Sequence, residues 1–256
     1  MQMMFTVYCR DRVYSMRVIY EPKGKAREYS PLALNLYNGC SNGCKYCYVP
    51  AYCRRDRKEF KNNTVIRKDV LKKLKMDCQE LEGGSRQILM CFTSDPYQMA
   101  EETYKITRQA IEILNRYGLN FQILTKSGSR AEKDFSLYKK GDTYAVTLTF
   151  DNERDSRKYE PEADIPEQRI KSLNNAKKKD ITTWVSLEPV ISPDQSLNLI
   201  DITYRFVDLF KVGKLNGYPE KEEKINWKQF GIKAIEKLEK YKKNYYIKKD
   251  LEKYLN

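Results

Sequence analysis

The sequence predicts an α/β fold in which strands and helices alternate along one chain. From about residue 30 onward, short apolar runs alternate with amphipathic helical patterns, giving six strands in strict alternation with helices. This order implies parallel strands joined by right-handed crossovers. With 256 residues, 41% of them hydrophobic, the chain can build one substantial domain with a core. The pattern fits a doubly wound sheet or an incomplete β/α barrel, and the lack of G-x-G-x-x-G after the first strand weakens the dinucleotide-binding version.

The predicted elements follow from periodicity and from turn residues at their ends. Strands are predicted at residues 32–37, 87–94, 120–127, 143–150, 182–190 and 209–216. Helices are predicted at 65–81, 103–118, 130–139, 167–179 and 195–208, with a last helix starting near Trp227. These elements divide the chain into a short strand-rich lead-in (1–29), an α/β domain (30–220) and a C-terminal helical extension (221–256).

The composition restricts the chemistry. The chain has 48 Lys and Arg against 35 Asp and Glu, a net charge of +13, and no histidine. The charge fits a polyanionic partner such as nucleic acid, and it equally fits lysines that coat solvated helices. Without histidine there is no Ser-His or Cys-His catalytic pair, so conventional hydrolysis is disfavoured and cofactor chemistry is favoured.

The sequence also predicts a soluble, cytoplasmic protein. No apolar run approaches the roughly 18 residues that span a bilayer, and the charged N-terminus lacks the pattern of a signal peptide. The seven cysteines are an odd number and include one tight triplet, which is typical of metal binding rather than of a disulfide framework.

The triplet consists of Cys40, Cys44 and Cys47, in the segment YNGCSNGCKYCYVP with spacing C-x3-C-x2-C. Three thiolates on one short loop can bind three irons of a four-iron cluster and leave the fourth iron open for chemistry. The alternative is a structural zinc site, which would need a fourth ligand, and only Cys53 is near in the sequence.

This loop, with Tyr46 just before its last cysteine, resembles the signature of the radical S-adenosylmethionine (SAM) superfamily. The resemblance implies a partial (β/α)6 barrel of the TIM type. Its open iron would bind SAM and reductively cleave it to a 5′-deoxyadenosyl radical. The longer segment KGKAREYSPLALNLYNGCSNGCKYCYVP and the hexapeptide TSDPYQ at 93–98 are similar to the spore photoproduct lyase, or DNA repair photolyase-like, branch.

The resemblance also implies cofactor-binding residues at the ends of the strands. Tyr46 would bind beside the cluster, and Thr93, Ser94 and Asp95 would hold the methionine amino group, although Ser94 and Asp95 equally suit a helix cap. The strand ends further along the chain supply the remaining predicted cofactor ligands: Lys126 for the methionine carboxylate, Thr147 and Thr149 for the sulfonium or ribose, Ser186 and Glu188 for the ribose hydroxyls, and Lys211 and Gly213 beside the adenine.

Two residues are candidates for radical hydrogen transfer. Tyr48 directly follows the cluster loop, where spore photoproduct lyases have a tyrosine. In that branch the donor cysteine directly precedes the Thr-Ser-Asp triplet, whereas this chain has Phe92 there and Cys91 one residue earlier. On an ideal strand Cys91 points to the opposite face, so it is either a donor brought round by a bulge or a core thiol.

Together these features predict a radical SAM enzyme that acts on nucleic acid, with DNA favoured, as a carbon–carbon lyase for thymine lesions. An external electron donor such as flavodoxin or ferredoxin is expected as a partner, and no membrane is. One alternative is the same cofactor chemistry on a peptide or small metabolite. The other is a nucleic-acid-binding protein with a structural metal site.

Overall fold

The computed structural model describes residues 17–256, which form two compact units. Among the described residues, the first unit contains residues 17–43, Cys47–Leu124 and Ser136–Asp142, and the second contains Cys44–Tyr46, Thr125–Phe135 and Thr143–Asn256. Most of the predicted lead-in, residues 1–16, lies outside the described residues. Within 17–256, no helix combines the length and the apolar character needed to cross a membrane.

The first unit is built on a mostly parallel sheet. Its strands follow the order β1 (Ile19–Tyr20), β2 (Leu32–Leu34), β5 (Ile88–Met90) and β6 (Phe121–Thr125). β1 is antiparallel to β2, whereas β2, β5 and β6 are parallel. A separate antiparallel pair, β3 (Tyr37–Asn38) and β4 (Val65–Ile66), flanks the cysteine loop in the sequence.

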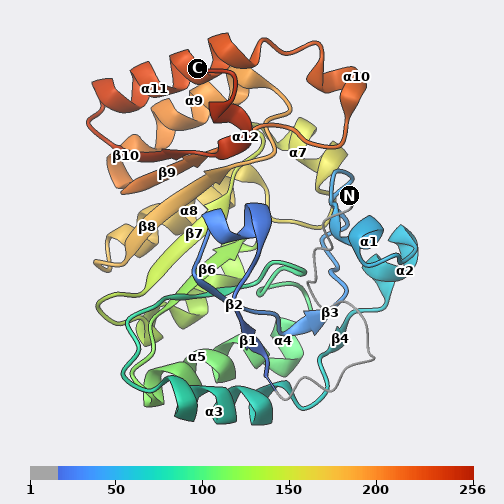
Figure 1. Cartoon of the computed structure of the whole chain (residues 1–256), viewed down its shortest axis with the longest axis vertical. Helices are drawn as coiled ribbons and strands as arrows, with labels where there is room; N and C mark the ends of the chain where they lie inside the picture. Colours follow the sequence, from blue (N-terminus) through green and yellow to red (C-terminus); the bar gives the residue numbers. More distant parts are fainter. Residues whose placement is uncertain (1–16) are drawn as a thin grey trace. The chain divides into compact units, whose positions relative to one another are not determined.

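Helices cover this sheet, and short helices follow the cysteine loop. They are η1 (Gly24–Glu28), α1 (Val49–Tyr52), α2 (Arg57–Asn62), α3 (Val70–Leu81), α4 (Glu101–Tyr104) and α5 (Ile106–Arg116). α3 and α5 pack against each other (Figure 1). The Asp56 carboxylate caps α2 by accepting the Glu59 amide at 2.9 Å, which fixes where that helix begins.

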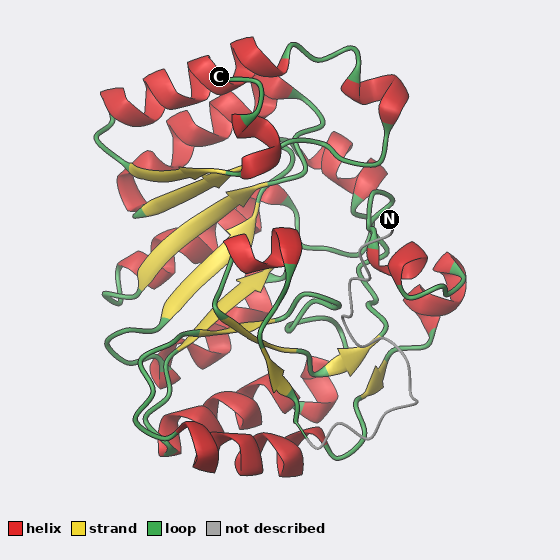
Figure 2. Ribbon diagram, in the orientation of Figure 1, coloured by secondary structure: helices red, strands yellow, loops and turns green. Residues whose placement is uncertain are grey.

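The second unit has four parallel strands in the order β7 (Thr143–Thr147), β8 (Thr182–Leu187), β9 (Leu209–Val212) and β10 (Asn244–Ile247) (Figure 2). The connecting segments hold α6 (Gly128–Ala131), η2 (Glu132–Leu137), α7 (Glu153–Tyr159), α8 (Pro166–Lys177), α9 (Pro193–Thr203), η3 (Tyr204–Phe206), α10 (Pro219–Glu222), α11 (Trp227–Lys240) and α12 (Lys249–Glu252). η2 extends past Phe135 into the first unit.

The core of the second unit lies on one face of its strands. Val185, Leu187, Phe210 and Val212 alternate along β8 and β9 and are fully buried. α8 packs against β7 and β8, and α9 packs against α11. Because side chains alternate along a strand, the opposite face of the same strands is left for the polar residues between these positions.

All six predicted strands are present, but they end earlier than the apolar runs suggest. The run 87–94, for example, forms a strand only over Ile88–Met90, because Asn35 Oδ1 accepts the amides of Phe92 and Thr93 at 2.9 and 3.0 Å and holds a turn there. The C-terminal tail, predicted as helical, also contains the strand β10. α7 is a further element that the periodicity does not predict.

Candidate functional site

In the first unit, Cys40 is held by the turn that follows β5. The Asp95 amide donates to Cys40 Sγ at 3.4 Å, and the Cys40 amide donates to the Phe60 carbonyl at 3.1 Å. Gly39 has φ +89°, and a Cβ there would lie 2.8 Å from the carbonyl oxygens of Phe60 and Asn63. Glycine is therefore required directly before the first cysteine.

The hexapeptide TSDPYQ is hydrogen-bonded to the cysteine loop. Gln98 is fully buried, and its Oε1 accepts the Ser41 amide at 2.8 Å. The Asp95 carboxylate accepts the Tyr97 amide at 2.8 Å and the Asn42 side-chain amide at 3.0 Å. The Tyr97 contact is a local turn of the kind expected for a capping aspartate, and the Asn42 contact ties the same carboxylate to the cysteine loop.

The Cys40 thiol suits a metal ligand. Burial, together with the nearby Asp95 carboxylate, raises the pKa of Cys40 to about 12, although the Asn42 and Asp95 amides lower it. A thiolate in this position needs a compensating positive charge, which iron supplies. The two amides that point at the sulfur are the outer hydrogen bonds typical of cluster ligands.

Thr93 and Asn42, in the first unit, each have a buried polar atom that no described residue contacts by a hydrogen bond. Neither Thr93 Oγ1 nor Asn42 Oδ1 has a hydrogen-bond partner among residues 17–256. Their residues are 6% and 1% exposed, so a bulk-water partner is largely excluded. Both lie in the loops that carry the predicted cluster and cofactor ligands, and they fit a site completed by a polar cofactor.

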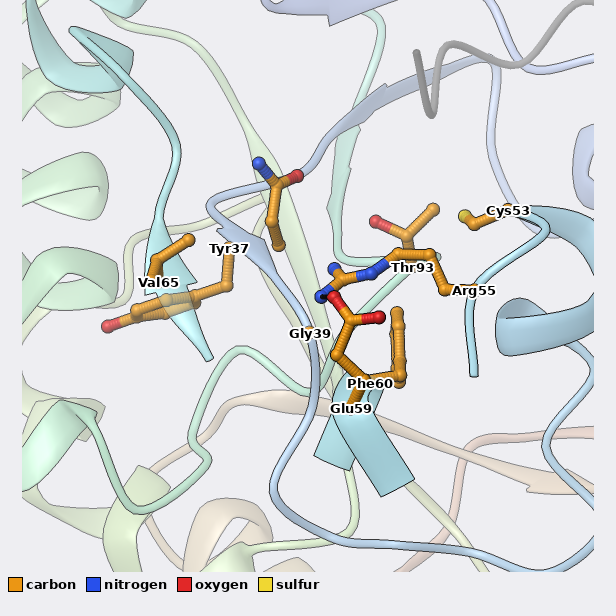
Figure 3. A pocket seen from close by; sticks show the side chains of 9 residues that line it. Tyr37, Gly39, Cys53, Arg55, Glu59, Phe60, Val65 and Thr93 are labelled. Atoms are coloured by element: carbon orange, nitrogen blue, oxygen red, sulfur yellow. Dashed lines mark hydrogen bonds and ion pairs between the residues drawn. The ribbon is translucent and has the colours of Figure 1, made fainter. Parts of the chain in front are cut away.

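A cavity of about 290 Å³ lies beside this loop in the first unit (Figure 3). Gly39 and Thr93 form part of its wall, together with Phe60 and the ion pair of Arg55 and Glu59 at 3.0 Å. Thr93 therefore borders open space on one side.

The two candidates for hydrogen transfer are placed differently. Tyr48 is 60% exposed, and its hydroxyl lies 3.5 Å from the Phe92 carbonyl. Cys91 is buried, and burial raises the pKa of its thiol to about 12, although the Leu36 backbone and the Ser94 hydroxyl lower it. Phe92, at the position of the expected donor cysteine, packs its ring edge-on to Tyr29 with centroids 6.1 Å apart.

In the second unit, the predicted residues form a row across all four strands. The strand register pairs Thr147 with Ser186, Ser186 with Lys211, and Lys211 with Tyr246. Paired residues on neighbouring strands point to the same face, so this row lies opposite the apolar core. The structure thus brings together three residues that were predicted separately, and β10 adds Tyr246.

A second row follows at the carboxyl ends of these strands. Lys248, just after β10, donates to Glu188 Oε2 at 2.5 Å, and both side chains are largely buried. A Cβ on Gly213 would lie 2.7 Å from the Glu188 carboxyl carbon, so the glycine leaves room for this carboxylate. The sequence predicts Glu188 and Gly213 but not Lys248, because the tail pattern favoured a helix.

The Cys44–Tyr46 segment belongs to the second unit. The Tyr46 hydroxyl donates to Glu160 Oε1 and lies 3.3 Å from Thr149 Oγ1. Lys126 Nζ lies 5.7 Å from the centroid of the Tyr46 ring, within the range of a cation–π contact. Three predicted residues therefore lie together, and Glu160 joins them without any signal in the sequence.

Among residues 17–256, no three His, Cys, Asp or Glu side chains gather closely enough to bind one metal ion. A four-iron cluster places its three thiolates on three different irons, so it does not need such a gathering. Cys53, the nearby cysteine considered as a fourth zinc ligand, is disulfide-bonded. The donor set fits a cluster better than a mononuclear zinc site.

The family model for the radical SAM superfamily matches residues 34–207. The chain therefore belongs to the radical SAM superfamily. Enzymes of this family use a 4Fe-4S cluster and SAM, which are the cofactors of this chain.

Among curated proteins, an uncharacterised protein of Methanocaldococcus jannaschii is 31% identical over 173 residues, covering 67% of this chain and 62% of that protein. An uncharacterised protein of Mycobacterium tuberculosis is 25% identical over 167 residues, covering 62% of this chain and 49% of that protein. The chain thus matches about half to three-fifths of the length of these relatives.

Among solved structures, a spore photoproduct lyase variant with bound SAM and a dinucleoside spore photoproduct matches 92% of this chain and 79% of its own, with TM-score 0.67 and 12% identity. SuiB of Streptococcus suis bound to SAM matches 84% of this chain and 45% of its own, with TM-score 0.61 and 10% identity. At these identities the likeness shows the fold, and the predicted α/β partial barrel of the TIM type is confirmed.

Proposed function

We propose that this radical SAM enzyme acts on nucleic acid, as a lyase for thymine lesions in DNA. The observation that carries the proposal is the position of Tyr48. Tyr48 is 60% exposed directly after the cluster loop, and its hydroxyl lies against the carbonyl of Phe92, the residue after Cys91. The net charge of +13 supports a polyanionic substrate.

The residues have distinct roles in this proposal. Cys40, Cys44 and Cys47 hold the irons. Once reduced by an external electron donor, a bound cluster would supply the electron that cleaves SAM, and SAM would supply a radical able to take hydrogen from a substrate. In the first unit, the Thr93 hydroxyl, which has no hydrogen-bond partner within residues 17–256, is suited to the methionine amino group. In the second unit, the Lys126 ammonium is suited to the methionine carboxylate and the Glu188 carboxylate to the ribose.

A second candidate is the same cofactor chemistry on a peptide or small metabolite. Phe92 occupies the position of the expected donor cysteine, and its ring packs on Tyr29. The Cys91 thiol is buried with a raised pKa. A buried neutral thiol can still donate a hydrogen atom, but only to a radical that reaches it, so this geometry favours a reaction that does not return hydrogen through a cysteine.

Isotope transfer separates the two candidates. Reduced, cluster-loaded protein is incubated with SAM and DNA that carries deuterated thymine, either irradiated or not. For lesion repair we expect deuterium in 5′-deoxyadenosine or SAM from irradiated DNA only, measured by mass spectrometry. Cofactor cleavage with no transfer from either DNA would reject the lyase proposal and favour the second candidate.

Two variants sharpen this test. If Cys91 and Tyr48 relay the hydrogen, Cys91→Ala and Tyr48→Phe should each lower product formation while deuterium abstraction persists. Cys78→Ala removes another buried thiol, on α3, and should leave both unchanged. Product formation at the wild-type rate in Cys91→Ala would show that Cys91 is a core thiol.

A further inference from the structure

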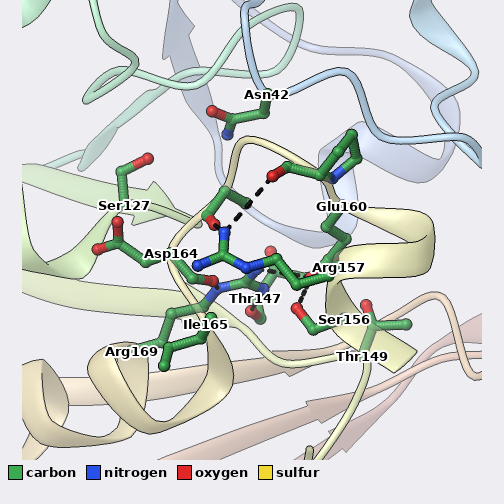
Figure 4. Close-up of polar contacts among 12 residues, drawn as sticks. Asn42, Ser127, Thr147, Thr149, Ser156, Arg157, Glu160, Asp164, Ile165 and Arg169 are labelled. Carbon is green, nitrogen blue, oxygen red and sulfur yellow. Dashed lines mark hydrogen bonds and ion pairs between the residues drawn. The ribbon is translucent and has the colours of Figure 1, made fainter. Parts of the chain in front are cut away.

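The Tyr46 side chain is anchored by a carboxylate 114 residues away in the sequence. Its hydroxyl donates to Glu160, which immediately follows α7 and is 1% exposed. The other carboxylate oxygen of Glu160 accepts Arg169 Nη2 at 2.6 Å and the Ser156 hydroxyl at 3.3 Å (Figure 4). Each oxygen of this buried carboxylate therefore has a donor.

Arg169 is itself fully buried and fixed on several sides. Its Nε donates to the Asp164 carbonyl at 2.7 Å, and its Nη1 donates to the Thr147 carbonyl at 3.0 Å. Thr147 ends β7, so the arginine connects the strand to the segment after α7. A buried ion pair contributes little net stability, and its best attested use is to specify one conformation. Here the pair places the Glu160 carboxylate against a guanidinium that is itself fixed by backbone carbonyls.

The backbone next to Tyr46 is held by the same part of the second unit. The Lys45 amide donates to the Tyr159 carbonyl at 2.8 Å, and the Lys45 carbonyl accepts the Tyr218 hydroxyl at 2.8 Å. Tyr159 and Glu160 are consecutive, so the end of α7 binds both the backbone and the side chain of the Cys44–Tyr46 segment.

We propose that Glu160 is a positioning residue that acts through the Tyr46 hydroxyl to hold the Cys44–Tyr46 segment in the conformation that receives the cluster and SAM. Cys44 is a predicted cluster ligand, and Tyr46 precedes the next ligand by one residue. The proposal rests on the radical SAM part of the proposed function and is independent of the substrate. Arg169 supports it by fixing the Glu160 carboxylate.

The sharpest test is Tyr46→Phe, because it removes one hydroxyl and leaves the Glu160–Arg169 pair in place. Tyr144→Phe is its matched control. The Tyr144 hydroxyl is buried and lies 2.8 Å from Ser172 Oγ, on the helix-covered face of β7. Both variants lose a tyrosine hydroxyl that is hydrogen-bonded within the second unit, but only the first loses a contact with the cysteine loop.

Hydrogen exchange of the Lys45 amide is the first measurement, made on the full-length, cluster-loaded protein. In Tyr46→Phe we expect it to accelerate about tenfold, the effect of losing one well-formed hydrogen bond, and SAM affinity measured by equilibrium dialysis to fall about as much. In Tyr144→Phe both should match the wild type. Unchanged exchange and affinity in Tyr46→Phe would overturn the proposal.

Glu160 variants then test the carboxylate itself. Glu160→Gln keeps an oxygen that accepts the Tyr46 hydroxyl, so it should restore most of the protection and affinity that Glu160→Leu loses. In the double variant of Tyr46→Phe with Glu160→Leu, the losses of amide protection and SAM affinity should not add, because both changes remove the same hydrogen bond between Tyr46 and Glu160. Additive losses would mean that Glu160 acts only through general stability.

Failure of the positioning proposal can be distinguished from failure of the proposed function. Iron and acid-labile sulfide content, with 5′-deoxyadenosine formation, test radical SAM chemistry in the wild-type protein. Exchange of the Lys45 amide tests positioning even where no cofactor is cleaved.

Discussion

The two units hold their parts of the cysteine loop by different means. In the first unit, two uncharged groups contact the loop. Gln98 Oε1 accepts the Ser41 backbone amide, and the Asp95 backbone amide donates to Cys40 Sγ. In the second unit, a buried ion pair between Glu160 and Arg169 holds Tyr46. The first arrangement comes from one hexapeptide, whereas the second is assembled from residues far apart in the sequence. The predictions below test whether the two arrangements are equally important.

The largest expected effect is loss of the cluster on removal of any one thiolate. Cys40→Ala, Cys44→Ala and Cys47→Ala should each abolish the four-iron cluster, measured as iron and acid-labile sulfide after anaerobic purification, because one iron loses its protein ligand. Cys78→Ala should keep the full cluster. Full cluster content in Cys44→Ala would show that the second unit contributes no ligand.

The second effect is on the stability of the second unit. Arg169→Met leaves Glu160 buried without its ion-pair partner, which should lower the free energy of unfolding by about 3–5 kcal/mol in denaturant titrations. Lys177→Met is the comparison, because its ion pair with Asp208 is 42% and 31% exposed and should be worth about 0–1 kcal/mol. Equal losses in the two variants would contradict the importance given to the buried pair.

Burial also raises the pKa of Glu160, although Arg169 opposes that shift. The folded state therefore favours the protonated carboxyl more than the unfolded chain does. Its contribution to stability should be greatest at low pH and decline as pH rises through the folded pKa. In Arg169→Met the opposing charge is gone, so this decline should be larger than in the wild type.

The third effect concerns the first unit. Gln98→Ala leaves the Ser41 amide without its acceptor and should cost about 1–3 kcal/mol. We expect faster loss of iron to a chelator than in the wild type. Gln109→Ala, which removes an exposed amide bonded to the Tyr104 carbonyl at 3.0 Å, should not change that rate. If Gln98→Ala keeps its iron as long as the wild type, the contact between Gln98 and Ser41 is not needed to retain the cluster.

The same contrast explains what could be predicted from sequence. The cysteine spacing and TSDPYQ are contiguous, so the Cys40 side of the site is visible in the sequence. The polar row of Thr147, Ser186 and Lys211 is predictable because strand alternation fixes which residues share a face. In these cases local pattern and final structure agree.

The parts that were missed depend on contacts that no local pattern encodes. Glu160 is 114 residues from Tyr46, and its polar environment exists only after the chain folds. Lys248 reaches Glu188 because β10 adds to the sheet, yet the lysines and tyrosines around Asn244–Ile247 do not alternate with apolar residues. β10 itself contains no charged residue, but lysines precede and follow it, and this composition is also typical of a surface helix.

The smallest expected effect tests whether the second unit holds the loop by its buried pair or by the sum of its contacts. Tyr218→Phe removes the hydrogen bond to the Lys45 carbonyl, which is exposed to water. Water can replace a hydroxyl donor at such a position, so the cost should be about 0.5–1.5 kcal/mol at most. Tyr241→Phe is the matched control, because it removes a 2.8 Å bond to Asp201 elsewhere in the same unit. Iron loss to a chelator should be slightly faster in Tyr218→Phe than in Tyr241→Phe, and much slower than in Arg169→Met.

If Tyr218→Phe instead loses iron as fast as Arg169→Met, the exposed contact holds the loop as strongly as the buried pair. The proposed difference between the two units would then be wrong, because uncharged hydrogen bonds would be enough to hold the loop in the second unit as well as in the first.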